Sequence, residues 1–203
     1  APDLVCFTVP FPGNLFAALR CSQFLKQFFP EIQIAFGGGY CNTELRSLED
    51  PRIFQFIDFI SLDDGEAPLL KIVNYIEAKV DINELERTFV LENNKVAYKN
   101  KIPNTIYHHK NLPAPKYSGL PFDKYLSFLD VVNPMHRMWT DKRWNKLSIS
   151  HGCYWSQCSF CDVSLDYIAN FQNTTADDLV DKIEIVMGDT NISGFHFVDE
   201  AAP

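Results

Sequence analysis

The chain has 203 residues, of which 46% are hydrophobic and 22% are charged, a composition typical of a globular protein with one large or two small domains. Its formal net charge of −8 lacks the basic excess of general nucleic-acid binders, so we expect no nucleic-acid partner. No apolar run approaches the roughly 20 residues of a membrane-spanning helix, so we expect no membrane partner either. Three of the six cysteines are clustered and three are scattered in apolar surroundings, which is typical of a reducing cytoplasm rather than a secreted scaffold.

The first 80 residues alternate short apolar runs with helical patterns. Residues 4–9 form a continuous apolar run, which predicts a strand buried on both faces, and Asn14 is expected to cap the helix that follows. The other elements predicted here are strands at residues 32–36 and 59–62 and helices at residues 43–55 and 68–76. This alternation predicts a parallel sheet with right-handed crossovers, which is a doubly wound, Rossmann-like α/β fold.

Ligands of such a sheet bind outside the carboxyl ends of its strands. Three loops are expected to meet at that edge, at residues 9–14, 37–39 and 63–66. Glycines after a strand allow a ligand to approach the backbone closely, which makes Gly37-Gly38-Gly39 a candidate binding loop. A glycine triplet is equally consistent with a tight turn between a strand and a helix.

The middle of the chain combines a hairpin with an extended segment. Residues 87–92 and 95–100 are predicted to be paired strands, because Asn93 and Asn94 both tolerate the positive φ that a two-residue primed turn requires. Residues 101–117 contain several prolines and no hydrophobic period, which indicates a linker. The adjacent His108 and His109 are expected to be solvated rather than bound to a metal.

A cluster of cysteines follows a strand-like run at residues 146–150. Cys153, Cys158 and Cys161 lie within nine residues, so their thiolates can converge on a single centre. Iron and zinc are the soft-metal candidates. A three-cysteine iron–sulfur cluster leaves one iron open for a substrate or cofactor, whereas a structural zinc site would take His151 as its fourth ligand.

The residues after this loop predict one further helix and one further strand. Thr175 and Asp178 form a candidate capping box, the helix is expected to end before Gly188, and residues 194–200 form the strand. The order strand, cysteine loop, helix, strand is that of the first unit of a barrel followed by its second strand. Because a barrel needs more strands and the chain has no initiator methionine, both ends are expected to be cuts in a longer protein.

The cysteine spacing C-x4-C-x2-C, with Phe160 before the last cysteine, resembles the loop of the radical S-adenosylmethionine (radical SAM) superfamily, which is usually C-x3-C-x-aromatic-C. The context GCYW..C.FCD is similar to a variant in the cobalamin-associated branches. Upstream, Gly37-Gly38-Gly39 and Asp64-Gly65-Glu66 resemble the "GG" and "GEGE" turns of the cobalamin-binding domain that precedes many radical SAM domains. The D-x-H-x-x-G motif, with which some cobalamin proteins ligate cobalt, does not occur, and no histidine precedes His108.

The resemblance implies a fragment with three parts: a cobalamin-binding-like Rossmann domain at 1–80, a hairpin-containing linker at 81–145, and the first β-loop-α-β of a truncated radical SAM partial barrel at 146–203. The implied cofactors are a [4Fe-4S] cluster, S-adenosylmethionine (SAM) and cobalamin. The implied parent enzyme cleaves SAM reductively with the electron of the cluster to generate a 5′-deoxyadenosyl radical. Its substrate, a small molecule or peptide, is not identified by the sequence, and its electron donor would be a protein such as flavodoxin or ferredoxin. The fragment alone is expected to be inactive.

The resemblance also assigns roles to residues. Cys153, Cys158 and Cys161 would hold the cluster, and Phe160 would pack against the adenine of SAM. Asp199 or Glu200 would accept hydrogen bonds from the methionine ammonium, because an ammonium beside a cluster needs an anionic or carbonyl acceptor. The implied cobalamin contacts are Thr8, Val9, Gly37, Gly38, Gly39, Asp64, Gly65 and Glu66. The alternative, from a different functional class, is a non-catalytic Rossmann-like binding module with a zinc-stapled cysteine loop.

Overall fold

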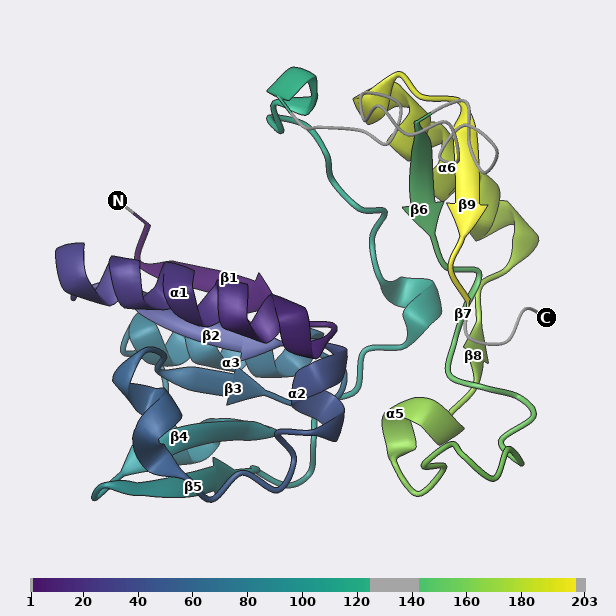
Figure 1. The fold of residues 1–203 in the computed structure, drawn as a ribbon. Coiled ribbons are helices and arrows are strands. Elements are labelled where there is room, and N and C mark those ends of the chain that lie inside the picture. Colours follow the sequence, from purple (N-terminus) through teal and green to yellow (C-terminus); the bar gives the residue numbers. More distant parts are fainter. Residues whose placement is uncertain (1, 125–142, 200–203) are drawn as a thin grey trace. The chain divides into compact units, whose positions relative to one another are not determined.

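Figure 1 shows the computed structural model of the chain, which describes residues 2–124 and 143–199. Residues 1, 125–142 and 200–203 lie outside the described part. The chain forms two compact units, residues 1–107 and residues 108–203. Within the described part, no helix is both long enough and apolar enough to cross a membrane.

The first unit is built on one five-stranded sheet with the strand order β1-β2-β3-β4-β5. Its elements, with η for a 3-10 helix, are β1 (Leu4–Thr8), α1 (Pro12–Phe28), β2 (Gln33–Gly37), α2 (Gly39–Thr43), η1 (Pro51–Gln55), β3 (Phe59–Ser61), α3 (Glu66–Ile76), η2 (Ile82–Glu84), β4 (Thr88–Glu92) and β5 (Lys95–Lys99). Strands β1, β2 and β3 are parallel, and Phe36 of β2 pairs with Phe7 on one side and Ile60 on the other. The carboxyl ends of these three strands therefore meet at one edge, as the predicted Rossmann-like fold requires.

A hydrophobic core covers each face of this sheet. Because neighbouring residues of a strand point to opposite faces, Phe36 and Ala35 of β2 enter different cores. Phe36 packs in the core that also buries Ala18 of α1, and Ala35 packs in the core that buries Ile72 of α3. Helices α1 and α3 thus lie on opposite faces, which confirms the doubly wound arrangement (Figure 1).

The hairpin forms as predicted and adds two antiparallel strands to the sheet. Asn93 and Asn94 have φ values of 49° and 59°, the left-handed conformation that the primed turn needs. Strand β4 pairs with β3, where Phe89 lies opposite Ile60. The amino end of β4 and the carboxyl end of β5 therefore lie at the same edge as the carboxyl ends of the parallel strands.

Three local predictions for the first unit are wrong. Strand β1 is an edge strand whose Cys6 is exposed, so it is not buried on both faces. Helix α1 begins at Pro12 with Phe11 as its N-cap, because proline is favoured in the first turn, and Asn14 already lies inside the helix. The helix expected at 43–55 is replaced by the short α2 and, after an irregular segment, by η1.

The second unit contains two small pairs of strands. Its elements are η3 (His109–Asn111), η4 (Phe122–Lys124), β6 (Trp144–Leu147), β7 (Ser150–His151), α5 (Asp166–Ala169), β8 (Gln172–Asn173), α6 (Ala176–Thr190) and β9 (Gly194–Phe197). Strands β6 and β9 are parallel, and α6 lies between them in the chain. Strands β7 and β8 are antiparallel and bracket the cysteine loop. The predicted order strand, cysteine loop, helix, strand is therefore present.

The boundaries of the strands and the helix in this unit differ from the predicted ones. The single strand expected at 146–150 is divided into β6 and β7, which pair with different partners. Thr175 caps α6 as predicted, with its hydroxyl oxygen accepting the Asp178 N–H at 3.2 Å. The helix continues past Gly188 and ends where Asn191 adopts the left-handed conformation (φ 55°), a role that asparagine shares with glycine.

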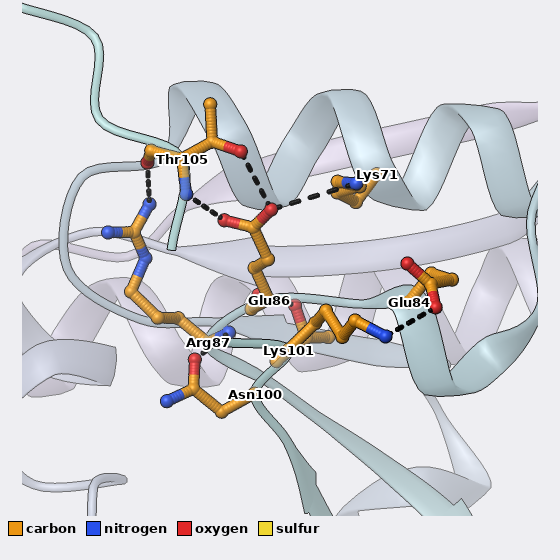
Figure 2. Close-up of polar contacts among 8 residues, drawn as sticks. Lys71, Glu84, Glu86, Arg87, Asn100, Lys101 and Thr105 are labelled. Carbon is orange, nitrogen blue, oxygen red and sulfur yellow. Dashed lines mark hydrogen bonds and ion pairs between the residues drawn. The ribbon is translucent and has the colours of Figure 1, made fainter. Parts of the chain in front are cut away.

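A buried carboxylate fastens the start of the linker to the first unit, as Figure 2 shows. Glu86 is 2% exposed, and its Oε2 and Oε1 accept hydrogen bonds from the backbone N–H and the hydroxyl of Thr105, at 2.7 and 2.8 Å. The Lys71 ammonium lies 3.7 Å from Oε1 and supplies the opposite charge. Beside this cluster, the Glu84–Lys101 ion pair is about half exposed.

These two glutamates predict very different stability effects. We expect Glu86→Ala to lower the free energy of unfolding of the first unit by about 2–4 kcal/mol, because it leaves the Thr105 backbone N–H and the Lys71 ammonium without this acceptor. Glu84→Ala should cost about 0.5 kcal/mol or less, because water replaces its surface partner. Hydrogen exchange at the amides of β4 measures both, and equal effects of the two substitutions would contradict this reading.

Candidate functional site

Two of the three predicted loops at the edge of the first sheet contact each other through the backbone. The Val9 N–H donates to the Gly37 carbonyl at 2.7 Å, and the Tyr40 N–H donates to the Val9 carbonyl at 2.9 Å. Gly38 has φ 98°, and a Cβ there would lie 3.0 Å from both Thr8 Cγ2 and the Val9 nitrogen. Glycine is therefore required at position 38 both by its conformation and by the lack of space.

The glycine loop is joined to the loop after β3 by two polar side chains of the intervening segment. Asn42 Oδ1 accepts the backbone N–H of Asp63 at 2.7 Å, and Arg46 forms an ion pair with the Asp63 carboxylate. The Arg46 Nε also donates to the Asn42 carbonyl at 2.9 Å. Asp63 adopts φ 60°, so these contacts stabilise an unusual backbone conformation. Asn42 and Arg46 were not singled out from the sequence, which carries no motif for them.

The third loop leads directly into α3. Gly65 is the residue before the helix and Glu66 is its first residue, where a negative side chain is favoured by the helix dipole. Arg87 donates to the Thr105 carbonyl at 3.4 Å, as Figure 2 shows, and to the Asp64 carbonyl, also at 3.4 Å. It therefore links this loop to the start of the linker. The structure therefore brings the predicted cobalamin contacts of all three loops to one edge, and their role in binding stays a prediction.

The three cysteines of the first unit have unequal surroundings. Cys41 is completely buried beneath the glycine loop, and this burial raises the pKa of its thiol to about 12. It is a core residue, as predicted. Cys6 and Cys21 are exposed on β1 and α1, so the expectation of apolar surroundings is wrong for them.

In the second unit, the backbone that enters the cysteine loop is closely packed. Gly152 has φ 73°, and a Cβ there would lie 2.3 Å from the Asn170 carbonyl oxygen. The Cys153 N–H donates to the Ile168 carbonyl at 2.9 Å. The first cysteine therefore begins the loop from a fixed backbone position.

The candidate metal ligands are three free, half-buried thiols on this one loop. Cys153 Sγ lies 3.5 Å from the Ser156 backbone N–H, and the Cys161 N–H donates to the Cys158 carbonyl at 3.2 Å. Across residues 2–124 and 143–199, no three His, Cys, Asp or Glu side chains are gathered in a geometry that holds a metal ion. The donor chemistry fits an iron–sulfur cluster, since such clusters take cysteine thiolates and are tuned by hydrogen bonds to the sulfurs. The assignment of these ligands stays a prediction.

The loop also presents aromatic side chains to solvent. Phe160, predicted to pack against an adenine, is 89% exposed, and Tyr154 and Trp155 are more than half exposed. Tyr154 packs its ring edge against Phe171. Phe160 is therefore available for a contact that this chain does not itself supply.

The acidic end of the second strand reaches the start of the cysteine loop. Asp199 Oδ1 accepts hydrogen bonds from the Ile149 and Ser150 N–H groups, at 2.9 and 2.6 Å, and from the Ser150 hydroxyl at 2.9 Å. Its Oδ2 is buried and has no hydrogen-bond partner in the described part of the chain. Glu200, the other predicted contact of the ammonium, lies outside the described residues.

A histidine from the linker also lies beside this region. The His109 ring stacks on that of His151, with centroids 6.3 Å apart, and its Nε2 lies 3.4 Å from the Ser148 carbonyl oxygen. Burial lowers the pKa of His109, and the hydrogen bond with Ser148 acts in the opposite direction. The expectation that both linker histidines are solvated is therefore right for His108 and wrong for His109.

Of the comparisons with known proteins, the one with solved structures supports the fold. No protein-family model matches the chain, and no curated protein matches it. Among solved structures, it is similar to the cobalamin-dependent SAM radical enzyme OxsB with aqua-cobalamin and SAM bound, at 14% identity and a TM-score of 0.68. It is also similar to the radical SAM methyltransferase TsrM from Kitasatospora setae with cobalamin and a [4Fe-4S] cluster bound, at 16% identity and a TM-score of 0.61.

These matches cover 98% of this chain but only 26% of OxsB and 38% of TsrM. The chain thus spans between a quarter and two fifths of the length of these enzymes. At such identities the likeness establishes a shared fold, and function has to be argued from the sites. The predicted fold, a Rossmann-like unit followed by the start of a radical SAM barrel, agrees with these neighbours.

Two glycines of the second unit provide a test of the close packing at Gly152, where the chain enters the cysteine loop. We expect Gly152→Ala to lower the free energy of unfolding of this unit by about 2–4 kcal/mol, because alanine is strained at positive φ and its Cβ overlaps the Asn170 carbonyl. Gly188→Ala is the control, since a Cβ there meets nothing within 4 Å and alanine favours a helix by about 0.5–1 kcal/mol. Urea denaturation followed by tryptophan fluorescence measures both, because all three tryptophans of the chain lie within residues 108–203. Equal stability of the two variants would show that Gly152 is not required.

Proposed function

We propose that this chain carries the cofactor-binding part of an enzyme that cleaves SAM reductively at a [4Fe-4S] cluster and starts radical chemistry, with cobalamin as a second cofactor. The contact between Asp199 and the peptide of Ile149 and Ser150 is the observation that carries this proposal. It places the acidic end of the second strand beside the start of the three-cysteine loop. This is the juxtaposition that joint binding of a cluster and an amino-acid ammonium would need.

Cys153, Cys158 and Cys161 would hold the cluster. When bound, such a cluster supplies the electron that breaks a sulfonium carbon–sulfur bond of SAM, and three protein ligands leave one iron open for the methionine moiety. The chain fixes the amino end of the loop through Gly152 and the Cys153 N–H, and the Ser156 N–H points at the Cys153 sulfur. Hydrogen bonds of this kind stabilise the negative charge of a cluster-bound thiolate.

SAM would be recognised by an anion and an aromatic ring. Asp199 Oδ2 is an unused buried acceptor, and buried polar atoms nearly always have a partner in native proteins, so a donor is expected there. The methionine ammonium is a donor of the right charge. Phe160 offers an exposed ring on which the adenine can stack, and this contact would also exclude water from one side of the site.

Cobalamin would bind at the carboxyl edge of the first sheet. The glycine loop allows a large ring to approach the backbone, and the contacts of Asn42, Arg46 and Asp63 hold this edge in one shape before a ligand arrives. Residues 1–107 contain no histidine, so no histidine of this unit would ligate the cobalt. The proposal also includes a cytoplasmic location and a small electron-donor protein such as flavodoxin or ferredoxin, whereas the substrate stays open.

The cysteines should act as one unit. After anaerobic reconstitution of the full-length protein, we expect about four iron and four acid-labile sulfide per chain, and Cys158→Ala should lose most of both because it removes one of three protein ligands. Cys21→Ala is the matched control, since its exposed thiol on α1 lies outside the loop. A Cys158→Ala protein with a full cluster would contradict the ligand assignment, and stoichiometric zinc in a colourless wild-type protein would instead support the zinc-stapled binding module.

The first unit should bind cobalamin through its preformed edge. We expect Gly38→Ala to weaken cobalamin binding by at least about tenfold, because the added Cβ displaces the Thr8 side chain and the Val9 backbone. Gly188→Ala, in the second unit, adds the same methyl group where nothing lies within 4 Å and should leave cobalamin binding unchanged. Titration with aqua-cobalamin, followed by its visible absorbance, gives both dissociation constants. The absence of binding by the wild-type protein would remove cobalamin from the proposal while leaving the cluster untouched.

A further inference from the structure

The two oxygens of the Asp199 carboxylate are used in very different ways. Oδ1 accepts three hydrogen bonds, all from Ile149 and Ser150, at distances of 2.6 to 2.9 Å. Oδ2 is buried and accepts none within the described residues. Asp199 comes two residues after β9, and 49 residues separate it from Ser150 in the sequence.

The hydrogen bonds to Oδ1 replace strand pairing that ends at this point. Strands β6 and β9 pair as far as Leu147 and Phe197, and the last backbone hydrogen bond runs from the Val198 N–H to the Leu147 carbonyl at 2.9 Å. After Leu147 the segment that follows β6 diverges from β9, and Ser150 pairs with β8 instead. The part-buried N–H groups of Ile149 and Ser150 at this branch donate to the carboxylate, and the loss of such an acceptor destabilises a fold.

The branch lies immediately before the cysteine loop. Two residues lie between Ser150 and Cys153, and both are fixed: His151 pairs with Gln172 of β8, and Gly152 has no space for a side chain. A change in the direction of the peptide at Ser150 is therefore passed on to Cys153. Cys153 itself is held by the hydrogen bond from its N–H to the Ile168 carbonyl.

We propose that Asp199 is a positioning residue whose Oδ1 sets the direction in which the chain leaves β6, and therefore the position from which Cys153 reaches the cluster. The structural part, the clamp on Ile149 and Ser150, stands on the hydrogen bonds alone. The consequence for the cluster rests on the proposed function. The same carboxylate would then serve two purposes, with Oδ1 on the backbone of the loop and Oδ2 kept for a donor of the ligand.

Two substitutions at one position separate these purposes. Asp199→Asn keeps a carbonyl oxygen that can face the two N–H groups and replaces Oδ2 by an amide nitrogen, which repels an ammonium. Asp199→Ala removes both oxygens. Asp189→Ala is a matched control, because its Oδ2 also accepts two backbone N–H groups of this unit, those of Tyr117 and Ser118, at 3.0 and 3.3 Å.

The clamp is tested in the metal-free full-length protein by hydrogen exchange at the amides of Ile149 and Ser150. We expect Asp199→Ala to accelerate exchange there by about 10- to 100-fold, and Asp199→Asn by no more than about tenfold, because a neutral acceptor bonds less strongly than a charged one. Asp189→Ala should leave these two amides unchanged. If Asp199→Ala does not fold, Asp199→Leu takes its place, because leucine is close to aspartate in size and offers no acceptor. Exchange equal to that of the wild type in whichever of these two variants folds would overturn the clamp.

The consequence for the cluster is tested after anaerobic reconstitution. We expect Asp199→Ala to bind at least about twofold less iron and to alter the electron paramagnetic resonance signal of the reduced cluster, whereas Asp199→Asn restores both and instead weakens SAM binding by at least about tenfold. Normal iron and an unaltered signal in Asp199→Ala, despite fast exchange at Ile149 and Ser150, would overturn the positioning role. A wild-type protein that takes up no iron–sulfur cluster would instead overturn the proposed function. Hydrogen exchange at Ile149 and Ser150 would still show whether Asp199 holds these two residues.

Discussion

A backbone N–H group that leaves the end of a strand loses its partner in the sheet but, when buried, still needs an acceptor. In both units of this protein, side-chain oxygens from distant parts of the sequence supply that acceptor. Asn42 receives the N–H of Asp63, Glu86 receives that of Thr105, and Asp199 receives those of Ile149 and Ser150. Glu86 fixes the start of the linker, whereas Asn42 and Asp199 fix loops of the two candidate sites.

This dependence gives the candidate site at the edge of the first sheet a defined shape. At the edge of the first sheet, the glycine loop contacts Val9 through the backbone and the loop after β3 through Asn42, so one loop does not move without the others. A binding surface that is ordered in advance does not lose conformational entropy when it binds, and this favours affinity. This order is accompanied by backbone strain, as the φ of 60° at Asp63 shows.

The sequence predicts what local patterns encode. Apolar runs mark the strands β2 and β3, the two asparagines mark the hairpin turn, and the cysteine spacing marks the loop, because in each case neighbouring residues carry the signal. The acceptors could not be predicted in this way, because Asp199 meets Ile149 across 50 residues and no periodic pattern connects them. The division of residues 146–150 into two strands has the same origin, since it depends on where β9 ends and β8 begins.

The cysteine loop shows the limit of order imposed by the protein alone. Its amino end is fixed by Gly152, by the Cys153 N–H and by the clamp of Asp199, whereas the three thiols are not gathered into a metal-binding geometry within the described residues. Metal binding and local folding are coupled, because deprotonated thiolates close together repel one another until a cation joins them. On the proposed function, the protein therefore needs to fix only the point at which the loop begins. Binding of the cluster would then supply the free energy that brings Cys158 and Cys161 together, while the contact of Asp199 with Ile149 and Ser150 would fix the point from which the loop starts.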